Sequence, residues 1–339
     1  MDLTTRDSLV AQFRRRVYAT NGITLFPHQA DWQLASEGWT LLDAAAGPGD
    51  YYTSVLVPTS EVRYGEVVVE SRLINAIPCS VVRRRIVPRD GGPAHVLADL
   101  AAFKSGKSWS AAAWGTGFAC LPNALVQLIG ITYSTSEPEF NYLAEFLLSE
   151  RGMNMKPASY QNDKRGGRMR ILLRNGCEFE VKSYEQKEGL KGKKVTSYIF
   201  SEAYQLPGLE CYTGVSQNLR ELRGFALFPT TPDRPWVGTL HDYGHGRDAD
   251  FHCTCNVDAA CNPFTFDQKA RDRDDPDKGG LMTREKYSIA WLGKLGSFVG
   301  RVYDFNRGDD SRYFSPLSHP GLWKPNILKE EVEHDHAVA

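Results

Sequence analysis

The spacing of apolar residues along the chain changes character several times. Leu9, Phe13 and Val17 recur at four-residue intervals, so we expect a helical stretch over residues 1–35. Residues 51–90 are rich in Val, Tyr, Ile and Thr and contain short runs in which apolar and polar residues alternate. This second pattern predicts β-hairpins, because successive side chains of a strand point to opposite faces.

From Val96 onward, apolar runs alternate with helical patterns, which is the order typical of a parallel sheet with crossover helices. We expect strands near 96–100, 124–132, 195–200 and 224–229, helices near 107–119, 137–150 and 210–220, and a hairpin over 168–183. Residues 269–280 mix both charge signs with Pro and Gly, so they predict a solvated linker before a last helical stretch at 283–292.

The fold class that these patterns predict is α/β, with a mainly parallel central sheet, a β-rich insertion and a small C-terminal subdomain. The chain then divides into an N-terminal helical segment (1–50), a β-rich insertion (51–94), an α/β core (95–262) and a C-terminal lid or linker (263–339).

Composition adds few constraints to this picture. Of the 339 residues 42% are hydrophobic and 24% charged, and no apolar run approaches membrane-spanning length, so we expect a soluble protein without a membrane partner. The N-terminus does not resemble a secretory signal. Seven cysteines do not make a disulfide framework in a chain this long, and we expect reduced thiols. Because the formal net charge is −1, nucleic-acid contacts require local basic patches.

A candidate phosphate-binding loop lies between the first core strand and an Ala-rich helical pattern. Ser105-Gly106-Lys107-Ser108 opens that helix, whose N-terminus would face an anion. Lys107 would contact the β- and γ-phosphates of ATP, and the Ser108 hydroxyl would ligate Mg²⁺, which prefers oxygen ligands. The usual spacing of such loops demands a glycine at position 101, where this chain has alanine, so the match is degenerate.

A candidate acidic partner follows a later strand. The apolar run Tyr198-Ile199-Phe200 ends in Ser201-Glu202, where two consecutive acids are typical of ATPases. Glu202 would be the base that polarises the attacking water, and Ser201 would take the metal-side position with a hydroxyl but no charge. The alternative interpretation is a buried strand followed by a helix-capping Ser-Glu pair.

Hydroxyl groups also end the next strand, at Thr230-Thr231-Pro232. Such groups can sense the γ-phosphate and pass the change to the part that grips the substrate. Taken alone, the same residues are typical of an ordinary turn before proline.

The order of these motifs resembles the ATPase region of the terminase large subunits, the DNA-packaging motors of tailed bacteriophages. The resemblance covers roughly residues 25–306 and rests on Phe26–Gln29, Ser105–Ser108, Thr132–Thr135, Leu190–Gly192, Ser201–Glu202, Thr230–Pro232, Asn262–Pro263 and Gly300–Tyr303. It implies a P-loop NTPase of the RecA/ASCE-like type. It also implies that Gln29 reads the adenine edge, that Lys191 stands where the family has a catalytic arginine, and that Thr230 and Thr231 couple hydrolysis to movement.

The function implied by the resemblance is ATP-driven translocation of double-stranded DNA into a viral procapsid. The implied cofactors are ATP and Mg²⁺, and the implied partners are DNA, the portal protein, the small terminase subunit and further copies of the chain in a ring. The implied location is the host cytoplasm, transiently at the portal vertex. The family's nuclease domain would begin near residue 339, so we expect no nuclease activity in this chain.

Two alternatives stay open. Ser201, Lys191 and the missing first glycine favour a non-hydrolysing nucleotide-binding scaffold of a packaging complex. A helicase-like DNA-dependent ATPase shares the loop, the glutamate and the hydroxyls, but about 100 residues after Thr231 leave too little chain for a second motor domain.

Two further residue groups carry weaker signals. Cys253, Cys255 and Cys261, with His241 and His245 upstream, have a faintly zinc-like composition at a non-standard spacing. The basic runs at 14–16 and 83–85 and the lysine-rich loop at 187–194 are candidate phosphate contacts, although most such runs are solvated surfaces.

Overall fold

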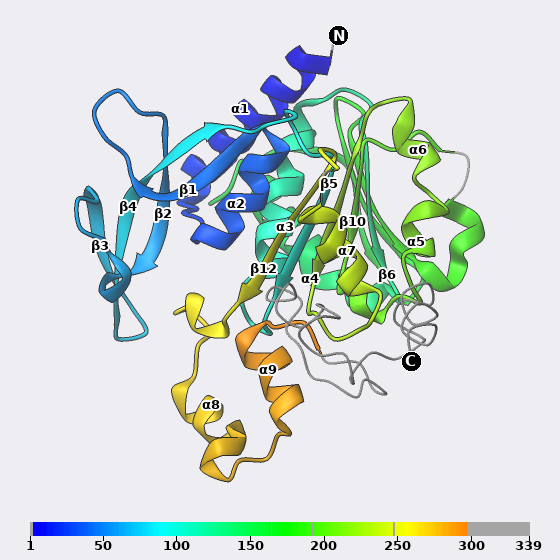
Figure 1. The fold of residues 1–339 in the computed structure, drawn as a ribbon. Helices are drawn as coiled ribbons and strands as arrows, with labels where there is room; N and C mark the ends of the chain where they lie inside the picture. Colours follow the sequence, from blue (N-terminus) through cyan, green and yellow to red (C-terminus); the bar gives the residue numbers. More distant parts are fainter. Residues whose placement is uncertain (1–2, 164, 191–192, 247, 297–339) are drawn as a thin grey trace, which may run out of the picture. The chain divides into compact units, whose positions relative to one another are not determined.

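The computed structural model describes residues 3–163, 165–190, 193–246 and 248–296 (Figure 1). Within these ranges, no helix is both long and apolar enough to cross a membrane. The N-terminal helical stretch is divided into α1 (Leu3–Asn21) and α2 (Pro27–Ser36). The division has a local cause, because Gly22 adopts a positive φ of 64° and Pro27 can only begin a new helix.

A mixed eight-stranded sheet in the order β12-β5-β11-β10-β6-β9-β8-β7 forms the centre of the molecule. The strands from β12 to β9 pair in parallel, whereas β8 and β7 are antiparallel to their neighbours. Their bounds are β5 (Val96–Ala101), β6 (Leu125–Gly130), β7 (Pro157–Asp163), β8 (Arg168–Leu173), β9 (Glu178–Ser183), β10 (Ser197–Phe200), β11 (Phe225–Thr230) and β12 (Phe251–Val257). The predicted core strands and the hairpin are confirmed, and so is the mainly parallel α/β class.

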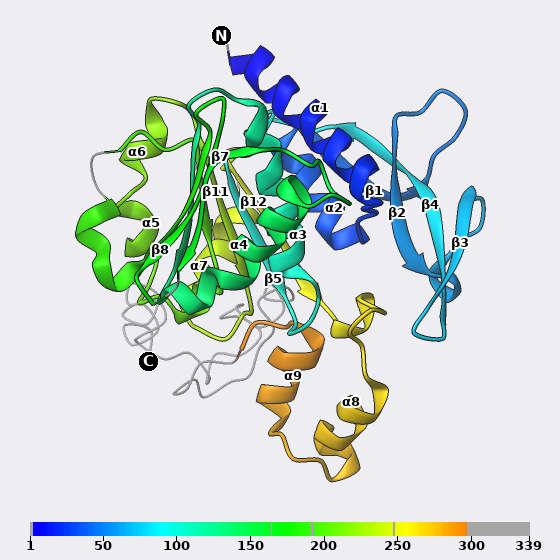
Figure 2. The same cartoon turned by 180° about the vertical axis from the view of Figure 1, so that it is seen from behind.

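Helices cover both faces of this sheet (Figures 1 and 2). On one face lie α1, α3 (Lys107–Gly115) and α4 (Tyr133–Leu148), and on the other lie α5 (Glu210–Thr213), α6 (Gln217–Arg220) and α7 (Val237–Gly244). Alternate strand residues feed the two cores: Leu97 and Leu128 pack toward α3 and α4, whereas Phe200 and Phe228 stack at 4.5 Å on the α7 face.

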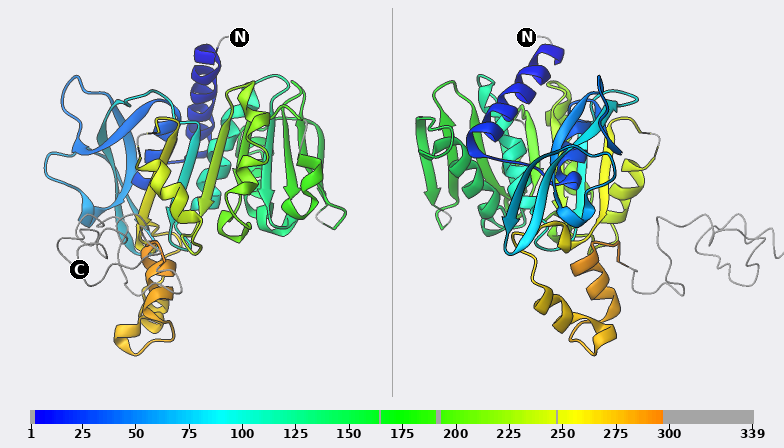
Figure 3. Two further views of the ribbon diagram at one scale, coloured as in Figure 1. Left: turned by 45° about the vertical axis from the view of Figure 1, so that its right-hand side comes forward. Right: turned by 90° about the vertical axis from the view of Figure 1, so that its left-hand side faces the viewer.

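A second, antiparallel sheet lies beside α2 (Figure 3). It consists of β1 (Trp39–Ala45), β2 (Tyr52–Pro58), β3 (Val68–Ile74) and β4 (Ile77–Pro88). The β-rich segment therefore begins at Trp39 and not at residue 51 as we expected. The reason is that β1 pairs with β4, a partner some 40 residues away whose register the local pattern cannot reveal.

The predicted linker over 269–280 is wrong, because most of it is helical. Asp267 caps α8 (Gln268–Asp274) by accepting bonds from two backbone N–H groups, and α9 (Arg284–Leu292) follows. The buried carboxylate of Asp274 accepts a hydrogen bond from Trp291 Nε1 at 3.2 Å and thereby joins the two helices. Trp291 in turn packs near Ala102, at the end of β5, so this helical pair contacts the loop that follows that strand.

Candidate active site

The segment that joins β5 to α3 curls into a loop that ends at Gly106. Gly106 has a φ of 90°, and a Cβ at this position would lie 2.8 Å from Gln29 Nε2, so glycine is required here. Because α3 begins at Lys107, the free backbone N–H groups of its first turn lie at the loop. The helix N-terminus therefore gives this loop a positive electrostatic end that favours anions.

A cavity of about 490 Å³ opens beside this loop. Lys107, Ser108 and Glu202 contribute polar groups to its wall. The apolar part of the wall comes from aromatic side chains, namely Phe26, Trp109, Tyr142 and Phe264. Cavities of roughly 300–1,000 Å³ with mostly apolar walls and a few convergent polar groups are typical ligand sites.

The ammonium of Lys107 is turned toward the backbone. Nζ donates to the carbonyl oxygens of Ala101 at 3.0 Å and Ala102 at 2.8 Å, and to Thr231 Oγ1 at 3.3 Å. Burial lowers the pKa of Lys107, while the neighbouring carboxylates, first of all Glu202, oppose that shift. A phosphate group in the cavity would offer this lysine full negative charges in place of neutral carbonyls.

Glu202 and Ser201 lie where β10 ends, at the carboxyl edge of the parallel sheet. Glu202 has a φ of 43° and ψ of 54°, a left-handed conformation that non-glycine residues avoid and that concentrates at functional sites. One of its carboxylate oxygens is buried and has no hydrogen-bond partner within the part of the chain that the structure describes. Ser201 is fully buried, and its hydroxyl also has no partner among the described residues.

Glu139, which sequence reasoning missed, brings a further carboxylate to this place. It lies on α4, is fully buried, and neither of its oxygens makes a hydrogen bond of good geometry within the described chain. Burial raises the pKa of Glu139 to about 7, and the nearby hydroxyls of Ser108 and Ser201 moderate that rise. The sequence does contain a signal for a buried Glu139, namely its spacing in the helix. Glu139 lies on the same helical face as other buried residues: Ser136, Leu143 and Phe146.

Gln29, to which the resemblance assigns adenine recognition, lies in the wall of the cavity. Its Oε1 accepts a bond from the Phe26 N–H at 3.1 Å, and its Nε2 donates to the carbonyl oxygens of Ser105 at 3.5 Å and Gly106 at 3.3 Å. Both ends of the amide are thus engaged with the chain, and only 1% of the residue is exposed. Gln29 fastens α2 to the Gly106 loop in this structure. Ser105 is also buried, and its hydroxyl has no partner within the described chain.

The two hydroxyls at the end of β11 connect the loop to the glutamate. Thr231 Oγ1 accepts the bond from Lys107, and Thr230 Oγ1 accepts a bond from the Tyr204 N–H at 2.8 Å. Tyr204 lies in the short 3₁₀ turn Ala203–Gln205 that directly follows Glu202. Neighbouring strand ends thus join Lys107 and Glu202 through two adjacent threonines.

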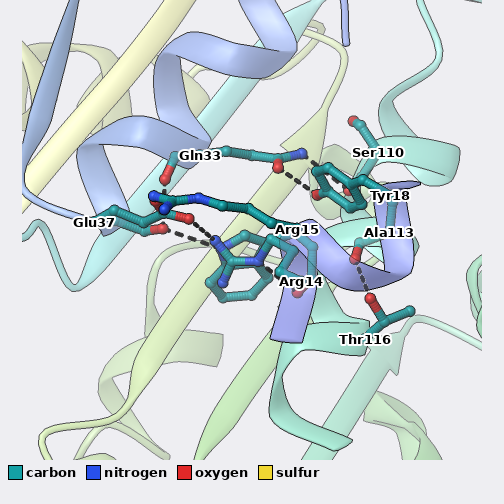
Figure 4. A network of polar contacts seen from close by, with 10 residues as sticks. Arg14, Arg15, Tyr18, Gln33, Glu37, Ser110, Ala113 and Thr116 are labelled. Atoms are coloured by element: carbon teal, nitrogen blue, oxygen red, sulfur yellow. Dashed lines mark hydrogen bonds and ion pairs between the residues drawn. The ribbon is translucent and has the colours of Figure 1, made fainter. Parts of the chain in front are cut away.

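A polar network holds α3 against α1 and α2 (Figure 4). Arg14 and Arg15 donate to the two carboxylate oxygens of Glu37 at 2.9 and 2.8 Å. Gln33 on α2 donates to the Ser110 carbonyl oxygen on α3 at 3.4 Å. Arg14 also donates from Nε to the Trp114 carbonyl oxygen on α3 at 3.2 Å, so this member of the basic run that we considered for phosphate contact helps to position the helix that carries Lys107.

The other candidate residues from the sequence lie away from the cavity or outside the described residues. Lys191 and Gly300–Tyr303 fall outside the described residues. Lys193 and Lys194, from the lysine-rich loop, form ion pairs with Glu180 and Glu221. These lysines precede β10, so they lie toward the opposite end of that strand from Glu202.

The three cysteines considered for zinc are not gathered into one group among the described residues. Cys253 is buried and donates to a backbone carbonyl, whereas Cys255 lies beside His245. The ligand-type cluster that the structure shows joins Cys255 to His241 and His245 and does not include Cys253 or Cys261. In a regular strand Cys253 and Cys255 would point to the same face. The pairing of β12 with β5 is irregular after Thr254, so this alternation does not hold for Cys255.

No protein-family model matches the chain, and no curated protein matches it. Among solved structures, it is similar to the ATPase domain of the large terminase of Thermus phage P74-26, with 17% identity, a TM-score of 0.47, and 59% of this chain and 88% of that one covered. It is also similar to the large terminase of another thermophilic bacteriophage, with 14% identity, a TM-score of 0.46, and 63% and 52% covered. The same terminase in complex with ADP gives 13% identity, a TM-score of 0.45, and 59% and 48% covered. The chain thus spans about half the length of that second terminase, and at these identities the likeness concerns the fold alone.

Proposed function

We propose that this chain is a Mg²⁺-dependent P-loop ATPase, the motor part of a phage terminase large subunit that moves double-stranded DNA into a procapsid. The observation that carries the ATPase part is the convergence of Lys107, Ser108 and Glu202 on one cavity at the N-terminus of α3. This cavity lies at the carboxyl edge of a parallel sheet, where α/β proteins of this kind bind their ligands.

In the proposed reaction, the backbone N–H groups at Gly106 and the first turn of α3 hold the phosphates of ATP. Lys107 leaves the carbonyls of Ala101 and Ala102 and neutralises charge on the β- and γ-phosphates. Glu202 orients the attacking water and accepts its proton as the bond to the γ-phosphorus forms. The leaving group is ADP, and the aromatic side chains of Phe26, Trp109 and Phe264 line the cavity that holds it.

The residues beside the loop fit a magnesium ion. Ser108 offers a hydroxyl, and the buried carboxylate of Glu139 offers the hard oxygen ligands that Mg²⁺ prefers. When bound, the ion neutralises phosphate charge. Ser201 contributes a second hydroxyl, and we assign to Glu139 the negative charge that ATPases of this type usually place at the position of Ser201. This assignment also explains why a carboxylate without a hydrogen-bond partner is kept buried at that point.

The threonines supply a route from hydrolysis to movement. When Lys107 turns toward a phosphate, Thr231 loses the bond that Lys107 makes in this structure. Thr230 anchors the turn after Glu202, so a shift at the end of β11 reaches the catalytic glutamate and α7. We propose that this shift drives the DNA-gripping surface, in a ring of copies docked on the portal with the small terminase subunit, in the host cytoplasm.

A second function, a nucleotide-binding scaffold that does not hydrolyse ATP, is favoured by one observation. Ser201 carries no charge, so a site without another acid would hold Mg²⁺ weakly. Glu139 is the observation against it, because its carboxylate lies beside the Ser108 and Ser201 hydroxyls.

Phosphate release from ATP and Mg²⁺, measured over a wide range of protein concentration with and without duplex DNA, tests the proposal. We expect turnover that rises with protein concentration and is lost in Glu202→Gln. The matched control is Glu210→Gln, which removes an exposed acid eight residues later and should leave the rate unchanged. Tight ATP binding without release, even with portal and DNA present, would favour the scaffold.

A further inference from the structure

A cluster of metal-ligand side chains lies away from the proposed nucleotide cavity. His241 lies on α7, His245 directly follows that helix, and Cys255 lies on β12. One ligand atom from each of the three lies within 4.8 Å of the other two. The spacing of four residues places both imidazoles on one side of the helix end, where their ring centroids are 4.3 Å apart.

The distances suit a tetrahedral zinc ion. Cys255 Sγ and His245 Nε2 lie 3.8 Å apart. Zinc bonds of about 2.0 Å to nitrogen and about 2.3 Å to sulfur, at a tetrahedral angle, place these two ligand atoms about 3.5 Å apart. For this pair a movement of a few tenths of an ångström would therefore suffice, and the ligand atom of His241 lies within 4.8 Å of both.

The groups that contact the Nδ1 atoms of the two histidines are also typical of a metal site. His245 Nδ1 lies 3.0 Å from the backbone carbonyl oxygen of His241, and because a carbonyl only accepts, Nδ1 must carry the proton. This leaves the lone pair of His245 on Nε2, the atom that faces Cys255. His241 Nδ1 lies 3.3 Å from the Asp242 carboxylate. A carbonyl or a carboxylate behind each imidazole is the usual arrangement around protein-bound zinc.

We propose that His241, His245 and Cys255 bind one zinc ion, with a water molecule in the fourth position. Zinc fits better than magnesium or calcium because two nitrogens and one sulfur are borderline-to-soft ligands. On binding, Zn²⁺ takes the place of the thiol proton of Cys255: the S–H bond breaks, a Zn–S bond forms, and the proton goes to solvent.

The site joins two elements that flank the proposed active site. α7 follows β11, which ends at Thr230, whereas β12 pairs with β5, the strand that leads into the Gly106 loop. β12 is also the edge strand of the large sheet. A zinc ion here would fasten α7 to that edge, and the site stands whether or not the chain hydrolyses ATP.

Cobalt substitution tests the proposal. The purified chain is stripped with a chelator, kept reduced with a phosphine, and titrated with Co²⁺ and then Zn²⁺. We expect a thiolate-to-cobalt charge-transfer band that saturates at one equivalent, tetrahedral d–d bands, and loss of both when Zn²⁺ is added.

Three variants locate the site. Cys255→Ser should abolish the charge-transfer band, and His245→Ala, at an exposed position, should weaken Co²⁺ binding at least about tenfold. Cys120→Ser changes another partly buried free cysteine and should leave the titration unchanged. Absence of the band at stoichiometric Co²⁺, or a band that persists in Cys255→Ser, overturns the proposal. If Cys255→Ser does not fold, an unchanged affinity in His245→Ala overturns it as well.

Discussion

Replacing Glu139 by glutamine should make the protein more stable and less able to use Mg²⁺. Glu139 is fully buried, and its pKa is raised from 4.5 to about 7, chiefly by burial. One unit of pKa shift corresponds to about 1.4 kcal/mol, so the ionised side chain costs the free protein about 3 kcal/mol of folding free energy.

The raised pKa of Glu139 determines how its contribution to folding stability changes with pH. Below the unfolded pKa the carboxyl is protonated in both the folded and the unfolded chain, so its contribution to stability is fully present. That contribution is lost as the pH rises from 4.5 through about 7, the folded pKa, because the unfolded chain ionises freely in this range whereas the buried carboxyl of the folded chain keeps its proton. Glutamine keeps the shape and never ionises. Glu139→Gln should therefore match the parent protein near pH 4 and exceed its stability by up to about 3 kcal/mol at pH 8.

Urea unfolding of the nucleotide-free protein at pH 5, 6, 7 and 8 measures this difference. Glu145→Gln is the matched control, because Glu145 lies on the same helix but is exposed, so its unfolding curves should follow those of the parent protein. A Glu139→Gln variant that is less stable than the parent at pH 8 would refute the reasoning, since it would mean that the carboxylate has a strong partner in the folded state.

Glu139→Gln should weaken Mg²⁺-dependent binding of ATP although it stabilises the fold. If Glu139 holds Mg²⁺, adding the ion should tighten ATP binding in the parent protein by more than in Glu139→Gln, whereas metal-free binding should be similar in both. Ser201→Asp in the Glu139→Gln background restores a carboxylate beside Ser108 and should recover part of the Mg²⁺ effect. An equal Mg²⁺ effect in parent and variant would remove Glu139 from the site and leave the ATPase proposal itself untouched.

Two further substitutions test the parts around the cavity. Gly106→Ala forces a side chain into a φ of 90° and against Gln29, so nucleotide affinity in a fluorescence titration should fall by about 1–3 kcal/mol while the fold persists. Glu37→Gln leaves the buried Arg14 guanidinium without its carboxylate, so urea unfolding should show a loss of about 2–4 kcal/mol. The control Glu70→Gln, at an exposed acid that pairs with Arg72, should cost little.

The features that could be predicted from the sequence are those that depend on near neighbours in the chain. Apolar runs located the core strands because buried parallel strands are apolar on both faces. The pairing of β1 with β4 could not be predicted, since one face of a short strand fits many partners. The helix α8 was missed because Pro276 and a string of charges suggest a loop, whereas the cap at Asp267 and the contact with Trp291 stabilise a helix.

The residues of the candidate site also divide into those that the sequence predicts and those that it does not. Lys107, Ser108 and Glu202 were identified because each follows a recognisable strand, and the parallel topology brings those strand ends together. The assignment of Gln29 to adenine stays a prediction: Gln29 lies in the wall of the cavity, but its position in the chain does not reveal the carbonyls that its amide meets in the folded protein. Glu139 was missed because a motif search looks for an acid next to Glu202 and not for one on another helix.

The topology explains how an acid can be supplied from that other helix. β6 pairs in parallel with β10, and the Ser201 N–H donates to the Ile129 carbonyl oxygen at 2.9 Å, so both strands end side by side. The chain that leaves β6 enters α4, and Glu139 lies in the second turn of that helix. A carboxylate from α4 and one from the end of β10 thus approach the same point from adjacent strands. The sheet therefore constrains where a negative charge can lie more strongly than which element supplies it, and a serine at position 201 is compatible with the proposed Mg²⁺ site.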